Sequence, residues 1–216
     1  MTPQPEPFAA NRLRVREGTL EGAIRWGEAE GDDPLLLHAI TLLLAPLRVG
    51  DQDVPEPKLR LHSLRLPVSS WAQLAGGSYP LGNVVREIVA DGESHPVYDA
   101  YGSLKLGDVY HEVVPSLVSF EPRDGCALAL HVEGRIEPAD APPSFAPVDF
   151  AIDADVALAA VRVVGDAGAA GYPSQERANP LAERLLDVDD YEPPVVEDGC
   201  VVLHPRCRET VVDAGT

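Results

Sequence analysis

The sequence has few lysines and a large excess of acidic residues. Only Lys58 and Lys105 are lysines among 17 basic residues, against 35 acidic ones, so the formal net charge is −18. Such a surface repels nucleic acids and anionic membranes, because both carry the same sign of charge. We therefore expect neither as a partner, and expect a basic protein instead. A GC-rich genome or salt adaptation would give the same composition, since net charge reports on solubility and association and not on fold.

Cysteine is also scarce. The three residues Cys126, Cys200 and Cys207 are odd in number and irregular in spacing, which excludes a disulfide framework. No Cys-x-x-Cys pair occurs, which argues against the usual structural zinc sites. Cys126 lies in an alternating apolar run and is predicted to be a small buried side chain. A bridge between Cys200 and Cys207 is compatible with their spacing.

No targeting or membrane segment is evident. Residues 1–11 are polar and lack the apolar core of a secretory signal. The most apolar stretch, 34–46, contains a histidine and is too short to span a bilayer. We therefore expect a cytoplasmic protein with no membrane association.

Proline and glycine, 21 and 18 residues, favour many turns and short elements over long helices. The clearest pattern is 126–136, where apolar and polar residues alternate after an apolar run at 113–120 and a turn, which predicts a hairpin. Further strands are predicted by the segments 12–15, 23–26, 59–66, 84–90, 148–153 and 161–163. The segment 195–203 is predicted to be a last strand or a hairpin around Asp198-Gly199. The apolar stretch 35–49 is predicted to be one or two buried strands, with a helix as the alternative. One short helix is expected at 181–186, opened by Pro180.

The segment 59–66 carries a change of phase. Leu59 and Leu61 share one face of a strand, whereas Leu64 and Leu66 alternate in the opposite phase. A single extra residue at His62-Ser63 would correct this slip, so we predict a β-bulge there.

These patterns predict an all-β fold. We expect an antiparallel β-sandwich or distorted barrel of about eight to ten short strands, with at most one or two short helices. We expect one domain at 12–204, between a flexible lead at 1–11 and a C-terminal tail at 205–216.

Several familiar catalytic and binding signatures are absent. The glycine-rich run 165–171 lacks the spacing of a dinucleotide-binding loop, because Asp166 stands where a glycine is needed. Neither a P-loop nor a Gly-x-Ser-x-Gly motif occurs. The acidic run 187–192 lacks the glycine and distal glutamate of a calcium-binding loop and is expected to be a solvated turn. No cofactor is expected.

One polar cluster, 95–112, is a candidate catalytic or metal site. Two histidines and a carboxylate form a legitimate ligand set, and a histidine beside a carboxylate suits acid/base work. The candidates are His95, Asp99, His111 and Glu112. Strand geometry places His111 and Glu112 on opposite faces, so at most one of them can join His95 and Asp99.

A contact surface is the preferred interpretation. Tyrosine and tryptophan provide large, rigid contact area, and carboxylates attract a basic partner. The predicted partner-binding residues are Trp71, Tyr79, Tyr98, Tyr101, Tyr110, Asp187, Asp189, Asp190 and Glu192. We expect a non-catalytic binding protein of the physical type of bacterial immunity proteins, which neutralise basic toxins. The alternatives are a metal-dependent or acid/base enzyme and a carbohydrate-binding β-sandwich.

Overall fold

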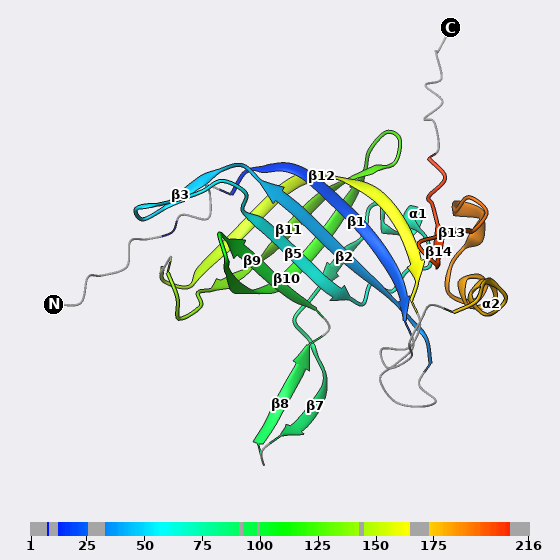
Figure 1. Cartoon of the computed structure of the whole chain (residues 1–216), viewed down its shortest axis with the longest axis horizontal. Coiled ribbons are helices and arrows are strands. Elements are labelled where there is room, and N and C mark those ends of the chain that lie inside the picture. The colour runs from blue at the N-terminus through cyan, green and yellow to red at the C-terminus, as the bar shows by residue number, and fades with distance from the viewer. Residues whose placement is uncertain are drawn as a thin grey trace, which may run out of the picture.

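The protein is a closed β-barrel with small additions at its two ends (Figure 1). The computed structural model describes residues 8, 13–25, 33–90, 93–98, 100–142, 145–164 and 173–207, with only some of the side chains in 84–98. The expectation of an all-β fold is confirmed, and its barrel form is the one adopted. Most of the predicted lead and the tail beyond residue 207 lie outside the described residues.

Seven strands form the barrel. In spatial order they are β1 (Val15–Arg25), β2 (Leu35–Leu44), β5 (Lys58–Leu64), β9 (Tyr101–Leu106), β10 (Val109–Pro122), β11 (Ala127–Glu137) and β12 (Val148–Val163). Each pairs antiparallel with the next, so an odd number leaves the first and last strands parallel. β1 and β12 close the barrel by this parallel pairing.

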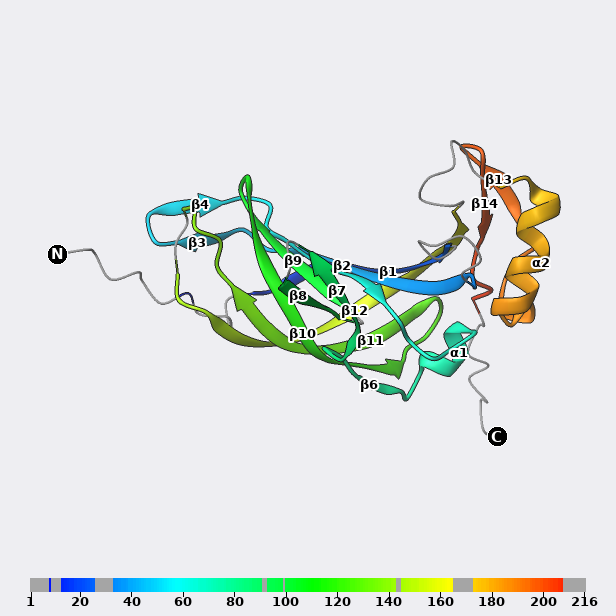
Figure 2. The ribbon, with the colours of Figure 1, turned by 90° about the horizontal axis from the view of Figure 1, so that it is seen from below.

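The other elements decorate the barrel. They are β3 (Leu47–Val49), β4 (Gln52–Val54), α1 (Trp71–Leu74), β6 (Ser78–Pro80), β7 (Val84–Ala90), β8 (Glu93–Tyr98), α2 (Gln175–Leu185), the 3₁₀ helix η2 (Val188–Asp190), β13 (Val195–Glu197) and β14 (Cys200–Leu203). The helices gather with β13 and β14 at one end, β3 and β4 lie at the other, and the β7–β8 hairpin projects from the side (Figures 1 and 2). No helix in the described part of the chain has the length and apolar character needed to cross a bilayer.

Two glycines allow the closing strands to approach each other. A Cβ atom added at Gly18 would lie 2.8 Å from the carbonyl oxygen of Asp155, and one at Gly22 would lie 2.8 Å from a methyl group of Val161. Side chains at these two positions would collide with β12. The β1–β12 seam therefore depends on the absence of side chains there.

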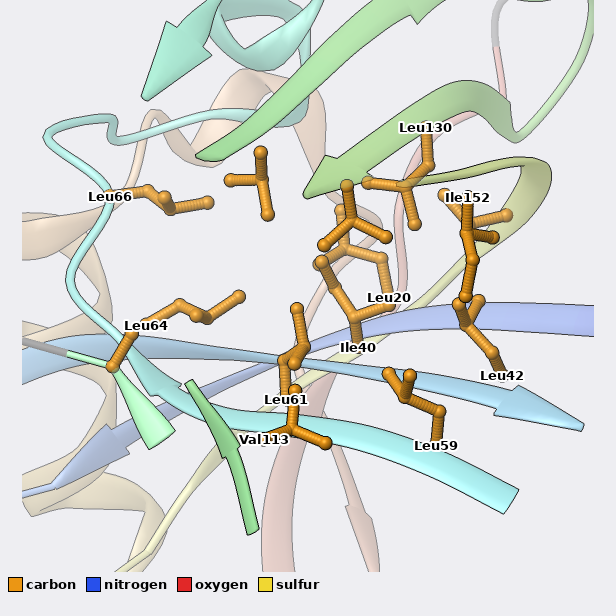
Figure 3. Packing of buried hydrophobic residues seen from close by; sticks show 14 of the residues in the cluster. Leu20, Ile40, Leu42, Leu59, Leu61, Leu64, Leu66, Val113, Leu130 and Ile152 are labelled. Atoms are coloured by element: carbon orange, nitrogen blue, oxygen red, sulfur yellow. The ribbon is translucent and has the colours of Figure 1, made fainter. Parts of the chain in front are cut away.

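Leucine, isoleucine and valine side chains fill the barrel (Figure 3). Leu20, Ile40, Leu61 and Val132 are fully buried, and every barrel strand contributes to the same apolar cluster. Phe8, in the segment expected to be a flexible lead, is also buried, with its ring 4.7 Å from that of Phe145. Because the inward side chains of all seven strands belong to one buried cluster, they fill the interior of the barrel.

The predicted bulge is confirmed. His38 pairs with Leu64 and Ile40 with Leu61, so one residue of β2 faces two of β5. Ser63 absorbs the extra length with a φ of 60°, in the left-handed region that non-glycine residues rarely adopt. Leu61 and Leu64 both point into the core as a result.

Several predicted boundaries are wrong. The predicted strands 12–15 and 23–26 are not separate, because Val15–Arg25 is one continuous strand, β1. The segments 148–153 and 161–163 form one continuous strand, β12, whose pairing with β1 shifts by one residue between Leu20 and Gly22. Helix α2 begins at Gln175 and contains Pro180 in its interior. Burial of Ala178 and Ala182 on one face outweighs the hydrogen bond that the proline cannot donate.

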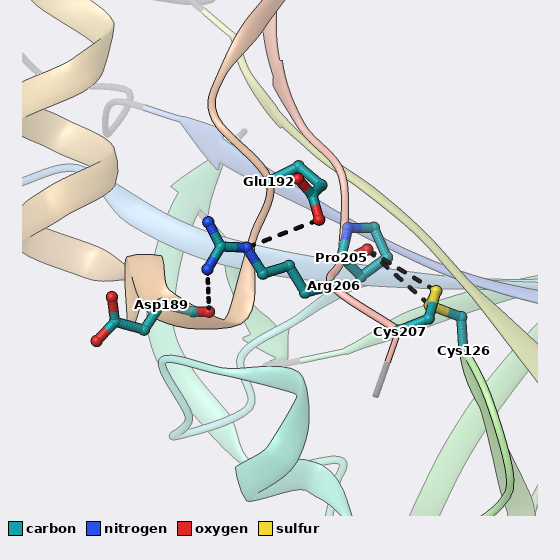
Figure 4. A network of polar contacts seen from close by, with 6 residues as sticks. All are labelled: Cys126, Asp189, Glu192, Pro205, Arg206 and Cys207. Atoms are coloured by element: carbon teal, nitrogen blue, oxygen red, sulfur yellow. Dashed lines mark hydrogen bonds and ion pairs between the residues drawn. A yellow bond between two sulfur atoms is a disulfide. The ribbon is translucent and has the colours of Figure 1, made fainter. Parts of the chain in front are cut away.

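The expectations for the cysteines are also wrong. Cys126 forms a disulfide with Cys207, and Cys200 is a buried free thiol whose Sγ lies 3.3 Å from the carbonyl oxygen of Val163. The bridge joins the β10–β11 turn to the chain after β14 (Figure 4). Residues 205–207 therefore pack against the barrel instead of beginning a free tail. The alternation of apolar and polar residues around Cys126 could not reveal a disulfide partner that lies 81 residues away in the sequence.

The disulfide should contribute measurably to stability. We expect Cys126→Ser to lower the free energy of unfolding by about 4 kcal/mol, because the bridge restricts a long loop in the unfolded chain. Urea unfolding with and without reductant measures this effect. Cys200→Ser is the matched control and should keep the response of the wild type to reductant. Peptide mapping that found a Cys200–Cys207 bridge would contradict the assignment.

Candidate functional site: an acidic face of the barrel

The barrel does not bring the predicted catalytic cluster together. His111 is fully buried, its Nδ1 accepts a hydrogen bond from the Ala139 backbone at 3.1 Å, and its ring lies 4.8 Å from that of Phe145. Glu112 is exposed, so the two point to opposite faces as predicted. His95 lies on the projecting hairpin, and both its side chain and Asp99 are outside the described residues. Among the described residues, no group of three or more His, Cys, Asp or Glu could hold a metal ion.

The aromatic residues are dispersed and do not form one surface. Trp71 is 5% exposed and packs between His38 and Tyr191, so its assignment as a contact residue is corrected. Its amphipathic ring caps the barrel core instead of facing solvent. A sugar could not stack on this indole.

The tyrosines occupy three separate places. Tyr79 is half-buried and donates to the carbonyl oxygen of Gln73 at 3.2 Å. Tyr98 and Tyr101 contact each other edge to face at the base of the β7–β8 hairpin. Tyr110, on β10, is 62% exposed beneath the ammonium group of Lys105. Of these four tyrosines, only Tyr110 is largely exposed on a barrel strand.

The predicted acidic segment 187–192 lies at the helical end of the barrel (Figure 4). Its residues form η2 and the turn after it, around Arg206, which lies 3.7 Å from the Glu192 carboxylate and donates to the Asp189 carbonyl oxygen at 3.4 Å. Tyr191 is buried within this segment. Part of its negative charge is therefore balanced locally.

A larger group of carboxylates lies on the outer surface of β10, β11 and β12, which we call the acidic face. Its carboxylates are Glu112, Glu121, Glu133, Glu137, Asp149, Asp153 and Asp155. Its cations are Arg123, His131 and Arg135. They form this surface because outward residues recur at every second position and the three strands are neighbours.

Each cation of the acidic face bridges two carboxylates. The guanidinium of Arg135 lies 2.7 Å from Glu137 and 3.1 Å from Asp149, and His131 contacts Asp153 at 2.7 Å and Glu133 at 3.1 Å. Arg123 contacts Asp155 at 3.0 Å and Glu121 at 4.0 Å. Seven carboxylates against two arginines and one histidine leave the face acidic whether or not the imidazole is protonated.

The aspartates of β12 are more exposed to solvent than the basic side chains that contact them. The side chains of Asp149, Asp153 and Asp155 are 81%, 86% and 72% exposed, whereas those of the three cations are 34–49% exposed. An approaching molecule therefore meets carboxylate oxygens first. A groove of about 430 Å³ lies among them, lined by Ser119, Glu121, Arg123, His131, Asp153 and Asp155.

The sequence predicts a solvent-exposed face for the strands 126–136 and 148–153, but it does not predict a site there. The signal was the alternation of His131, Glu133 and Arg135 with apolar residues, and of Asp149 and Asp153 with apolar residues. What was missing was the knowledge that β11 and β12 are neighbours. Only the pairing of His131 with Asp153 and of Arg135 with Asp149 combines these residues into one surface.

The charge state of His131 reports on this surface. Hydrogen bonds from its ring to Asp153 and Glu133 raise its pKa above the ordinary value of 6.5. We expect Asp153→Asn to lower the pKa of His131, because a neutral amide stabilises the imidazolium less. An NMR titration of the imidazole measures this shift. Asp149→Asn, on the same strand but paired with Arg135, should leave the pKa nearly unchanged, and an equal shift in both variants would contradict the geometry.

A second histidine makes stability depend on pH. Burial lowers the pKa of His38 to about 4, against the effect of a hydrogen bond with the Leu64 backbone. Since the unfolded chain binds this proton near pH 6.5, the contribution is complete above pH 6.5 and is lost as the pH falls towards 4. It amounts to about 3 kcal/mol.

Replacing His38 should make the free energy of unfolding depend less on pH below pH 7. Between pH 7 and pH 4.5 the free energy of unfolding falls in both proteins. We expect this fall to be about 2–3 kcal/mol smaller in His38→Gln than in the wild type. Urea unfolding at the two pH values measures the difference. His204→Gln, which alters an exposed imidazole, is the control. Parallel losses in wild type and His38→Gln would show that His38 is not the titrating group.

The chain was compared with protein-family models, with curated proteins and with solved structures. No family model, no curated protein and no solved structure matches it.

Proposed function

We propose that this protein is a non-catalytic binding protein that captures a basic protein partner through the acidic face. The observation that carries the proposal is the row of β12 aspartates, which stand in solvent above the cations that orient them. Charge complementarity of this kind accelerates association and selects among partners. The net charge of −18 also attracts a positively charged partner over a longer range.

The rigidity of the face supports this function. The carboxylates are carried by paired strands of the barrel, and six of the seven, all except Glu112, contact Arg123, His131 or Arg135. Holding them in place before binding reduces the conformational entropy that a complex would otherwise lose. The groove beside them offers a recess for a basic side chain of the partner.

One pair on the face is unfavourable in the free protein. Glu112 lies directly opposite Glu137 in the β10–β11 ladder, and like charges in this position repel. A lysine or arginine from a partner would relieve this repulsion. Tyr110, two residues from Glu112 and largely exposed, provides a neighbouring aromatic contact.

A basic toxin enzyme is one partner of the required chemistry. Immunity proteins cover the positively charged site of such an enzyme with a fixed acidic surface, and the acidic face is of that physical type. The proposal therefore extends to neutralisation of a basic enzyme. It depends on charge and geometry, and not on any likeness of sequence.

The disulfide bears on where capture takes place. Disulfides persist in oxidising compartments and are rare in the reducing cytosol. The Cys126–Cys207 bridge therefore favours an oxidising compartment over the cytoplasmic location that the sequence led us to expect. Alkylation of free thiols in intact cells before lysis distinguishes the two, because a cytosolic protein would be modified at Cys126 and Cys207.

A charge-neutralised variant tests capture. We expect Asp149→Asn/Asp153→Asn/Asp155→Asn to fold normally, since exposed ion pairs contribute at most about 1 kcal/mol each. Immobilised wild-type protein should retain a basic partner that elutes as salt is raised, and the triple variant should lose most of it. The matched control is Asp187→Asn/Asp189→Asn/Glu192→Gln, which removes the same charge at the helical end of the barrel and should retain the partner.

Two results would overturn the proposal. One is retention of the same proteins by the wild type and the triple variant. The other is the absence of any retained protein at low salt together with turnover of a small molecule. Circular dichroism and thermal melting of each variant exclude unfolding as the cause of lost binding.

A further inference from the structure

A second groove of opposite character lies on β1, β2 and β5, beside the C-terminal part of β12. Its volume is about 310 Å³, and its rim carries Arg25, Arg60, Arg162 and His62 with a single carboxylate, Glu21. Three guanidinium groups around one hollow are unexpected in a chain with 17 basic and 35 acidic residues. We call this hollow the basic groove.

Small residues create the hollow. The outward residues in the middle of the groove are Ala23 on β1 and Ala39 on β2, and both line it. Ala23 pairs with Arg162 across the barrel seam, and Ala39 pairs with Glu21. Long side chains therefore surround a floor of methyl groups, which leaves space above the strands.

In the part of the chain that the structure describes, two of the three arginines have no ion-pair partner. Arg60 contacts Glu21 at 3.0 Å. Among the described residues, neither Arg25 nor Arg162 forms an ion pair. The arginines of the acidic face each contact two carboxylates. Within the described residues, the basic groove thus brings together two arginines that have no ion-pair partner.

The bulge of β5 forms one wall of the basic groove. Ser63 and His62 both line it, and Ser63 holds the left-handed backbone conformation described above. Backbone strain of this kind is concentrated at ligand-binding sites. Burial and the neighbouring Arg60 lower the pKa of His62, so near pH 7 its ring is neutral and provides an N–H donor without adding charge.

We propose that the basic groove binds a phosphate group, either as free phosphate or as part of a small phosphorylated molecule. Guanidinium groups pair with phosphate oxygens through two parallel hydrogen bonds, and here Arg25, Arg60 and Arg162 surround one hollow. The volume lies at the lower end of the range for small-molecule sites. The floor of Ala23 and Ala39, with Leu37 at its edge, suits the apolar part of an organic phosphate.

The acidic face does not prevent this binding. Asp155 and Arg162 are seven residues apart on β12, which corresponds to roughly 23 Å along an extended strand. At physiological ionic strength charges are screened over about 8 Å. Local charge therefore decides which ions the basic groove attracts, although the whole molecule is negative.

Calorimetric titration tests the proposal with inorganic phosphate and phenyl phosphate as probes at constant ionic strength. We expect saturable binding to the wild type and about tenfold or greater weakening in Arg25→Gln/Arg162→Gln, which removes two charge-assisted contacts. The matched control is Arg123→Gln/Arg135→Gln, which removes the same charge from the acidic face and should bind within about twofold of the wild type. Tighter binding of phenyl phosphate identifies a phosphorylated molecule as the ligand, and equal binding identifies free phosphate.

A second readout does not depend on how the variants fold. In wild-type protein titrated with phosphate, the imidazole signals of His62 should move in a saturable manner while those of His131 stay in place. Three results would overturn the proposal: no saturable binding of either probe, equal losses in the two double variants, or movement of His131 without His62.

Discussion

The parallel pairing of β1 with β12 is the interaction on which the rest of the structure depends. Without it the seven strands would form an open sheet with two exposed edges, and such edges invite association with other chains. Closure converts the inward side chains of all seven strands into one core, including Leu20 from the first strand and Ile152 from the last. It requires close contact at Gly18 and Gly22, where any side chain would meet β12.

Closure also fixes what the outside of the barrel presents. β12 contributes Asp149, Asp153 and Asp155 to the acidic face and, further along, Arg162 to the basic groove. One strand thus carries regions of opposite sign at its two ends. The separation matters because charges that were close together would pair and neutralise each other, whereas charges separated by more than the screening length act independently. The two proposed binding functions follow from this distribution.

The histidines illustrate how position determines chemical character. His131 lies on the outer surface between two carboxylates, which raise its pKa. His38 and His111 lie inside the barrel among aromatic rings, and burial lowers the pKa of both. His111, one of the candidate catalytic residues in the sequence, is thus an interior side chain. His131, which takes part in a polar network, looked in the sequence like an ordinary residue on the solvent-facing side of a strand.

The sequence by itself determined which side of the alternating strands is buried, as at 126–136 and 148–153, because apolar residues at every second position point one way. It placed the bulge at His62-Ser63, where the phase changes. It also offered a hairpin around Asp198-Gly199 as one of two alternatives, and this is the one adopted, with both residues at positive φ. Only the tertiary structure decided which strands are neighbours, since a period of two residues carries no information about partners. The acidic face, the basic groove and the Cys126–Cys207 bridge each join segments far apart in the chain. The acidic face needs only the pairing of β10, β11 and β12, whereas the basic groove exists because β1 and β12 close the barrel, and closure is a property of the seven strands together.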